Sequence, residues 1–323
     1  MSNGHATPLI STTGTRDGRG SSGPAAQLEW SSSGAIVTKR RRHLVLFGLV
    51  AASIVVTVVC SSFGAAALSG IDWLTALREL ITPEHGDSAG TAGVILFQLR
   101  IPRVLMGFLV GGALASVGVT LQALLRNALA DPYVLGVSSG AALGAAIAML
   151  LGIGATSILL PMLPLWGFAG GLIALALIYR MAQSHGRLPI HSLLLAGVIL
   201  NAILTAMIMF ITSIMDPARS AGLMAWLMGS LTAPGWIGLI GIALYVMAGT
   251  MCLLYYAPVL NVLTQGEDTA RSLGIDTDRT KKRLYAVTAL LTGAVVSVSG
   301  MIGFVGMVIP HAVRMAIGSD QRV

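Results

Sequence analysis

The sequence predicts an all-α integral membrane protein, built as a polytopic helical bundle. Hydrophobic residues make up 55% of the 323 residues and charged residues only 10%, whereas soluble domains carry about 25% charged residues. Apolar runs of bilayer-spanning length follow one another along the chain. A soluble fold of this size would need a charged shell, so this apolar surface must face lipid or another helix.

The N-terminal region changes character at the first apolar run. Residues 1–38 are rich in Ser, Gly and Thr and lack apolar periodicity, which predicts a disordered cytoplasmic tail. Four basic residues at 39–42 precede an apolar run at 44–68. The core of a signal peptide has about 7–15 apolar residues, whereas a run of about 25 is long enough to span a bilayer. We therefore predict a first transmembrane helix and a membrane domain over 39–323.

Seven further apolar runs follow the first one. Their Gly, Ala and Ser residues, as in SSGAALGAA at 138–146, allow helix backbones to approach closely. With the first run they give eight expected spans. The further runs lie at 103–125, 134–153, 157–179, 192–214, 237–257 and 284–299, with a shorter one at 302–317.

Two segments contain helices too short or too interrupted to cross a membrane alone. In 213–236, an Asp216-Pro217 turn precedes a short apolar stretch that ends at Pro234-Gly235. In 300–314, glycines loosen one end and Pro310 is expected to interrupt the middle. Short and broken helices surround many transport pathways, but loops packed on a bundle have the same composition. The sequence leaves both interpretations open for each segment.

The basic residues predict the orientation of the spans. With the tail inside, sixteen of the 20 Lys and Arg residues lie inside and four lie outside, at Arg78, Arg100, Arg103 and Arg219. This bias follows the positive-inside rule and places the N-terminus in the cytoplasm. Because the basic residues lie mostly at the ends of apolar runs, the net charge of +7 does not indicate a nucleic-acid partner.

Motifs for catalysis, nucleotide binding and metal binding are absent from the sequence. We find no GxxxxGK[ST], HExxH, CxxC or GxSxG pattern. Cys60 and Cys252 lie inside apolar runs, as small buried residues do. We therefore predict no catalytic residue, metal site or cofactor, and the energy for any active transport must come from another polypeptide. The spans also lack Asp and Glu, which argues against an ion- or proton-coupled secondary transporter.

The segment 260–283 is the longest strongly charged stretch outside the tail. Gly266 and Gly274 bracket a predicted helix of about two turns, and Leu263, Ala270 and Leu273 give the segment apolar contacts to offer. A solvated loop is the simpler interpretation. We favour a surface that docks a partner.

Several long motifs closely resemble the FecCD family of ABC transporter permeases. They are RIPRVLMGFLVGGALASVGVTLQALLRNALADPYVLGVSSGAALG (100–144), LLLAGVILNAI (193–203), MAWLMGSL (224–231), GEDTARSLGI (266–275) and GFVGMVIPHAVR (303–314). The resemblance covers about 40–323 in order. It implies the inner-membrane subunit of an importer for an iron chelate (ferric siderophore or haem) or cobalamin.

The resemblance also implies an assembly. Members of the FecCD family are homodimeric or pseudo-dimeric type II ABC importers. They work with two cytoplasmic ATP-binding subunits and a periplasmic or lipid-anchored substrate-binding protein. Family permeases have ten spans and continue through two more where this sequence ends, at 318–323. An ion- or proton-coupled carrier and an inactive truncated membrane remnant are the alternatives that we weigh.

The resemblance assigns roles to three sets of residues. The binding protein is expected to meet Arg100 and Arg103, for which anchoring of a helix end is the alternative role. A cytoplasmic gate is expected at Asn127, Leu129, Ile190 and His191. The ATPase-docking residues are expected to be Gly266, Glu267, Ala270, Arg271, Leu273 and Gly274.

Overall fold

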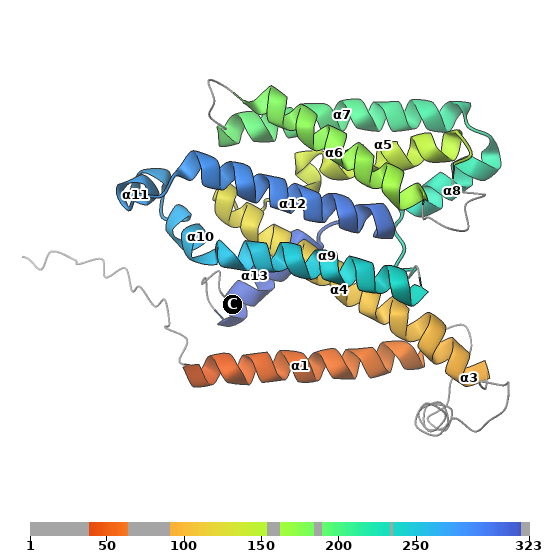
Figure 1. Cartoon of the computed structure of the whole chain (residues 1–323), viewed down its shortest axis with the longest axis horizontal. Coiled ribbons are helices and arrows are strands. Elements are labelled where there is room, and N and C mark those ends of the chain that lie inside the picture. The colour runs from red at the N-terminus through yellow and green to blue at the C-terminus, as the bar shows by residue number, and fades with distance from the viewer. Residues whose placement is uncertain (1–38, 64–90, 154–161, 184–188, 233–234, 318–323) are drawn as a thin grey trace, which may run out of the picture. The chain divides into compact units, whose positions relative to one another are not determined.

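The computed structural model describes residues 39–63, 91–153, 162–183, 189–232 and 235–317. Within these ranges every regular element is helical, and the helices belong to one compact unit, 37–323 (Figure 1). The predicted tail at 1–38, most of the predicted outside loop with Arg78, and the end of the chain at 318–323 lie outside the described residues.

The helices follow the order of the predicted spans, with short helices between them. They are α1 (Lys39–Ser62), α3 (Thr91–Val94), the π-helical η1 (Ile95–Arg100), α4 (Ile101–Leu125), the 3₁₀ helix η2 (Pro132–Leu135), α5 (Val137–Leu150), α6 (Met162–Ala182), α7 (Ile190–Ile214), α8 (Pro217–Leu227), α9 (Gly235–Tyr255), α10 (Ala257–Leu263), α11 (Glu267–Ser272), α12 (Thr277–Ser299) and α13 (Val305–Ile317).

Each predicted span coincides with a helix, but the helices differ in length and polarity. Four described segments are long and apolar enough to cross a membrane: Ile95–Leu125, Met162–Ala182, His191–Ile214 and Gly235–Tyr255. Phe47–Ser62 and Val137–Leu150 are shorter apolar helices. α12 begins seven residues before the predicted span at 284, because Asp276 caps it by accepting a hydrogen bond from the Arg279 backbone N–H at 3.0 Å.

Backbone contact between glycine-rich faces holds α5 against α6. A Cβ atom on Gly140 would lie 2.6 Å from the carbonyl oxygen of Gly170, and one on Gly170 would lie 2.2 Å from that of Gly140. Neither position can carry a side chain without moving a helix. The predicted role of the small residues at 138–146 in close helix packing is therefore confirmed.

The two short segments form helices of different kinds. α8 starts where Asp216 accepts the Arg219 backbone N–H at 3.0 Å, and it buries Leu223 against α5. The expected interruption at Pro310 is wrong, because α13 runs through that residue. Pro310 deprives the Gly306 carbonyl of its usual i+4 donor, and the Gln122 amide of α4 reaches this carbonyl at 3.5 Å instead.

Candidate functional site

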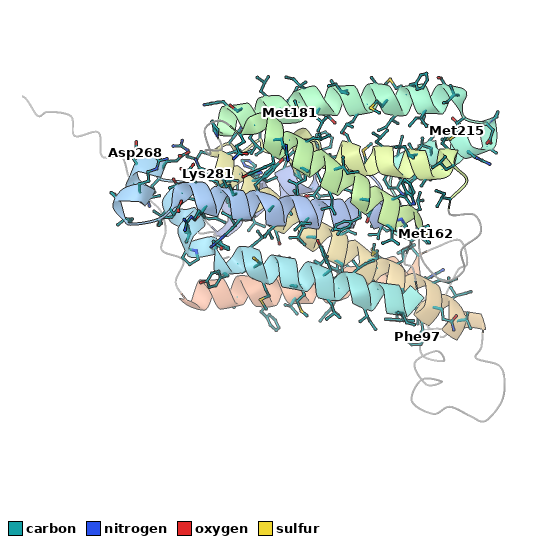
Figure 2. The ribbon with its side chains drawn as sticks, turned by 45° about the horizontal axis from the view of Figure 1, so that its top comes forward. Phe97, Met162, Met181, Met215, Asp268 and Lys281 are labelled. Atoms are coloured by element: carbon teal, nitrogen blue, oxygen red, sulfur yellow. The ribbon has the colours of Figure 1, made fainter. Side chains whose placement is uncertain are left out.

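The predicted functional residues lie at two ends of the bundle. Figure 2 shows Phe97, Met162 and Met215 at one end, and Asp268 and Lys281 at the other. Arg100 and Arg103 follow Phe97 directly in η1 and α4. The predicted ATPase-docking and binding-protein surfaces are therefore on opposite ends of the bundle.

The charged segment folds as a hook made of α10, α11 and the start of α12. Gly266 (φ +133°) and Gly274 (φ +80°) bound α11 in backbone conformations that other residues rarely adopt. Ala270 is fully buried beneath α11, and Leu260 and Leu263 of α10 are buried as well. The predicted short helix between two glycines is confirmed, and it is packed on the bundle rather than solvated on all sides.

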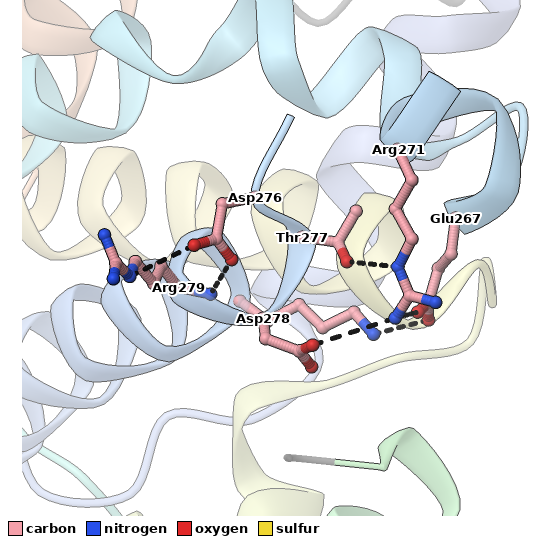
Figure 3. Close-up of polar contacts among 7 residues, drawn as sticks. Glu267, Arg271, Asp276, Thr277, Asp278 and Arg279 are labelled. Carbon is pink, nitrogen blue, oxygen red and sulfur yellow. Dashed lines mark hydrogen bonds and ion pairs between the residues drawn. The ribbon is translucent and has the colours of Figure 1, made fainter. Parts of the chain in front are cut away.

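Ion pairs fix α11 to the first turns of α12 (Figure 3). Lys281 is only 5% exposed, and its Nζ lies 2.5 Å from Oε1 of Glu267. Arg271 lies 3.8 Å from Glu267 and 3.7 Å from Asp278, and its Nε donates to Thr277 Oγ1 at 3.1 Å. The buried Lys281 ammonium therefore has the partner that a buried charge requires.

Gly266 is the N-cap of α11, and the other five predicted docking residues fall into two groups. Glu267 and Ala270 contact the rest of the chain and support the hook, and Arg271 pairs with its neighbours. Leu273 is 65% exposed, and a Cβ atom on Gly274 would meet open space. A single exposed apolar side chain is ordinary on a protein surface, so docking of a partner here stays a prediction.

The two predicted gate segments lie at the same end of the bundle. Asn127 Oδ1 accepts the Leu129 backbone N–H at 2.9 Å, and both side chains are exposed. His191 is exposed in the first turn of α7, which begins at Ile190. The helix η2, which follows the first gate segment, packs against α7, which begins with the second. The side chain of Ile190 lies outside the described part of the chain.

Asp131 links the first gate segment to the start of α13, a connection that sequence reasoning missed. Its carboxylate accepts the backbone N–H of Tyr133 at 2.8 Å, which caps η2, and the backbone N–H of Phe304 lies near enough to favour the charged form. Burial raises the pKa of Asp131 above 3.8, and the two hydrogen bonds oppose this shift only in part. An Asp-Pro pair is a helix-start signal, but no local pattern indicates the distant contact with Phe304.

The two arginines of the RIPR motif have different surroundings. Arg100 Nη1 donates to the carbonyl oxygens of Ser61 at 2.7 Å and Ser62 at 3.0 Å, so Arg100 satisfies the C-terminal end of α1. Arg100 therefore has the alternative role that the sequence left open, which is to anchor a helix end. Arg103, one turn further along, is exposed beside a cavity between α1 and α4.

The interior of the described part of the bundle contains few ionisable side chains. Ser139 of α5 donates a short hydrogen bond to Asn201 Oδ1 of α7, a polar contact inside the bundle that the sequence analysis did not single out. Among the described residues, no group of three or more His, Cys, Asp or Glu side chains is placed to hold a metal ion. The described arrangement therefore offers surfaces for partners and a small-residue interior.

Comparison with known proteins identifies the family that the sequence motifs resemble. Residues 41–323 match the FecCD transport family. The chain is 40% identical over 255 residues to the cobalamin import system permease protein BtuC of Halobacterium salinarum, covering 79% of this chain and 68% of that protein. It is 38% identical over 234 residues to the hemin transport system permease protein HmuU of Yersinia pestis, covering 71% and 68%.

A further relative and a solved structure are also similar to this chain. The chain is 36% identical over 233 residues to the iron-uptake system permease protein FeuC of Bacillus subtilis, covering 71% and 69%. An inward-facing metal-chelate type ABC transporter matches with a TM-score of 0.73 at 28% identity, covering 86% of this chain and 83% of that one. The protein is therefore a multi-pass ABC transporter permease and belongs to the FecCD transport family.

Proposed function

We propose that the chain is the transmembrane subunit of an importer that takes up an iron chelate or cobalamin across the bacterial inner membrane. The observation that carries this proposal is the family match over 41–323, together with relatives named for cobalamin, hemin and iron uptake. The chain works as a homodimer with its N-terminus in the cytoplasm. Among the possible substrates, we rank a ferric siderophore first.

A separate ATP-binding subunit drives the transport through the hook. Ion pairs join Glu267 and Arg271 to the start of α12, so a subunit that contacts Leu273 would act on the same hook that leads into α12. Leu273 and Gly274 provide the contact surface, and Glu267 and Arg271 hold it in shape.

The opposite end receives the substrate from a binding protein. Arg103 is exposed there and suits a partner surface with acidic residues, since charge complementarity speeds encounter. Asn127, Leu129, Ile190 and His191 form the cytoplasmic gate. Asp131 approaches the backbone of Phe304, directly before α13, which offers a route by which movement of α13 could reach the gate.

Transport by a reconstituted complex tests this function. Proteoliposomes would contain the chain, the ATPase encoded beside its gene and the matching binding protein, and uptake of ⁵⁵Fe-labelled siderophore, haem and ⁵⁷Co-labelled cobalamin would be measured with and without internal ATP. We expect ATP-dependent uptake of at least one of them. Uptake that persists without ATP would indicate a secondary transporter, and no uptake of any substrate would contradict the proposal.

The variant Leu273→Arg tests the docking surface separately. Because Leu273 is exposed, the change should leave the fold intact but abolish co-purification of the ATPase with the chain. Leu151→Arg is the matched control, since Leu151 is 59% exposed at the end of α5, away from the hook. If the ATPase still co-purifies with Leu273→Arg, the docking assignment is wrong.

A further inference from the structure

The longest apolar helix in the described part of the chain changes its winding near one end. The chain is helical from Thr91 to Leu125, but six of these residues, Ile95–Arg100, form the π-helical turn η1 between α3 and α4. A π-helix is rare and occurs mostly as a single wide turn inside an α-helix, often at a functional site. Phe97, within this turn, lies at one end of the bundle (Figure 2).

Pro102 explains where the π turn ends. The backbone N–H of Ile101 donates to the carbonyl oxygen of Leu96, five residues earlier, which is the π pattern. The next bond of this pattern would join residue 102 to the Phe97 carbonyl, but proline has no N–H. The Phe97 carbonyl therefore lacks the donor that a π-helix would supply, and the donor that an α-helix would supply is directed at Leu96.

Trp236 of α9 provides the missing donor. Its indole N–H donates to the Phe97 carbonyl oxygen at 3.1 Å, a normal hydrogen-bond length. The preceding residue, Gly235, has a φ of +73°, which other residues rarely adopt, and it begins α9. The start of α9 is thus held against the turn by a specific contact with its backbone.

An α-helical winding would satisfy the same carbonyl without the indole. If the Ile101 N–H turned from Leu96 to Phe97, the turn would become α-helical and the Phe97 carbonyl would be bonded within the helix. The cost is contact between the Pro102 ring and the carbonyl four residues earlier, that of Gln98. The π register is therefore favoured by one hydrogen bond from the indole and by relief of one proline contact.

The sequence of the turn tolerates a change between these two registers. Ile95, Leu96 and Phe97 are consecutive apolar residues, and Leu96 is only 1% exposed. A shift of one residue turns the preceding segment by about 100° and advances it by about 1.5 Å. A neighbouring apolar side chain then takes the buried place of Leu96, so the interior stays apolar in both registers.

We propose that η1 is a joint with two registers and that Trp236 holds it in the π register. The joint connects three helices, because Trp236 belongs to α9 and Arg100, the last residue of η1, donates to the Ser61 carbonyl at the end of α1 at 2.7 Å. When α9 withdraws the indole, the turn winds into the α register and the segment 91–96 rotates. Movement of α9 relative to α4 is thereby passed on to the end of the bundle that carries Phe97.

Anchoring at the membrane interface is the simpler role for Trp236, since Trp is common at the ends of spanning helices. Anchoring requires no particular acceptor and no π turn. The contact of the indole with a carbonyl that Pro102 leaves without a helical donor favours the joint.

Solid-state NMR of the full-length chain in liposomes tests the proposal. Phe97-Gln98 is the only Phe-Gln pair in the sequence, so labelling with carbonyl-¹³C phenylalanine and ¹⁵N glutamine selects the Phe97 carbonyl. Its chemical shift depends on the hydrogen-bond donor and on the winding of the helix. We expect one main signal from the wild type. Neither the ATPase nor the binding protein is present, so failure here is distinguishable from failure of the proposed transport function.

Two variants shift the register. Pro102→Ala removes the ring contact, so a second signal, from the α register, should become the main one. Trp236→Phe keeps an aromatic ring but loses the N–H, and it should raise the population that gives this same second signal about fivefold, as expected for loss of one neutral hydrogen bond. Trp166→Phe is the matched control, because Trp166 lies in α6, which packs against α5, α7 and α12.

Three results would overturn the proposal. A Phe97 signal that Trp236→Phe leaves unchanged would mean that the indole only anchors α9 at the membrane surface. A Pro102→Ala signal at the wild-type position would mean that the turn has a single register. Different new signals in the two variants would mean that Trp236→Phe removes a donor without changing the winding.

Discussion

Several polar side chains in this apolar protein satisfy a particular backbone or charge requirement. Gln122 is 3% exposed, and its amide reaches the carbonyl that Pro310 leaves without a donor. Arg100 satisfies two carbonyl oxygens at the end of α1. Such groups are costly to leave unpaired inside a bundle. Polar substitutions here are therefore expected to act on the fold before they act on transport.

Asp131→Asn should stabilise the protein at neutral pH. Burial raises the native pKa of Asp131 above 3.8, so the folded state binds the proton more tightly than the unfolded state does. This contribution to stability is fully present below pH 3.8 and is lost as pH rises through the native pKa. Asparagine keeps an oxygen for both N–H groups without the charge. We expect the Tm at pH 7 to rise by roughly 2 °C.

The measurement is a thermal melt in detergent at pH 7 and at pH 3.5. Because the pKa of Asp131 is raised by burial, the wild type loses this charge as the pH falls, so the difference in Tm between the two proteins should be smaller at pH 3.5 than at pH 7. A lower Tm for Asp131→Asn at pH 7 would show that the carboxylate charge stabilises the contact with Tyr133 and Phe304.

The pair of Glu267 and Lys281 gives a second prediction for single residues. Glu267→Gln removes the negative charge that faces the buried Lys281 ammonium, and we expect a loss of about 2 kcal/mol in stability. Lys281→Met in the same protein should recover part of this loss, because no unpaired buried charge remains. Thermal melts of both single variants and the double variant measure the coupling, and additive losses would contradict it.

At the scale of elements, close contact between α4 and α13 holds the last described helix in place. A Cβ atom on Gly118 would lie 1.8 Å from the carbonyl oxygen of Gly306. Gln122, one turn further along α4, donates to Met307 at 3.3 Å. The two helices thus touch through backbone at one turn and through an amide at the next.

Gly118→Ala should therefore displace α13. The added methyl group overlaps a backbone atom that cannot rotate away, so we expect a loss of about 3 kcal/mol or a shifted helix. Gly112→Ala is the matched control on the same helix, because a Cβ atom there meets nothing within 4 Å. It should be neutral or slightly stabilising. Thermal melts compare the two variants, and equal Tm values would rule out the close contact.

The order of helices was predictable from the sequence, but their ends and partners were not. Apolar runs of about 20 residues identify spans because lipid requires internally bonded backbone. The hook between Gly266 and Gly274 was predictable for a similar reason, since two glycines interrupt a charged helix. The path of α13 through Pro310 was not, because the donor that replaces the missing bond comes from Gln122, about 190 residues earlier.

At the scale of the whole molecule, the sequence predicted which candidate residues lie together at each end of the bundle. It did not predict how each residue is placed within its set. Charge bias and motif order place Arg103 at one end and Leu273 at the other, and Figure 2 shows Phe97 and Asp268, which lie near them in the sequence, at opposite ends. Which residues of each set contact the rest of the chain, and which are exposed, could not be predicted from the sequence. Arg100 satisfies a helix end while Arg103 is exposed, although they are two arginines of the same short motif.

The orientation of the bundle is the last prediction. In a variant with Cys60 and Cys252 replaced by Ala, Thr269→Cys in the hook and Ala218→Cys at the start of α8 would each provide one exposed thiol. Because the basic residues gather at the hook end, that end should face the cytoplasm. A membrane-impermeant maleimide added to intact spheroplasts should then label Ala218→Cys, and Thr269→Cys only after lysis. The reverse pattern would place the hook outside, where no ATPase could reach it, and would refute the importer assignment.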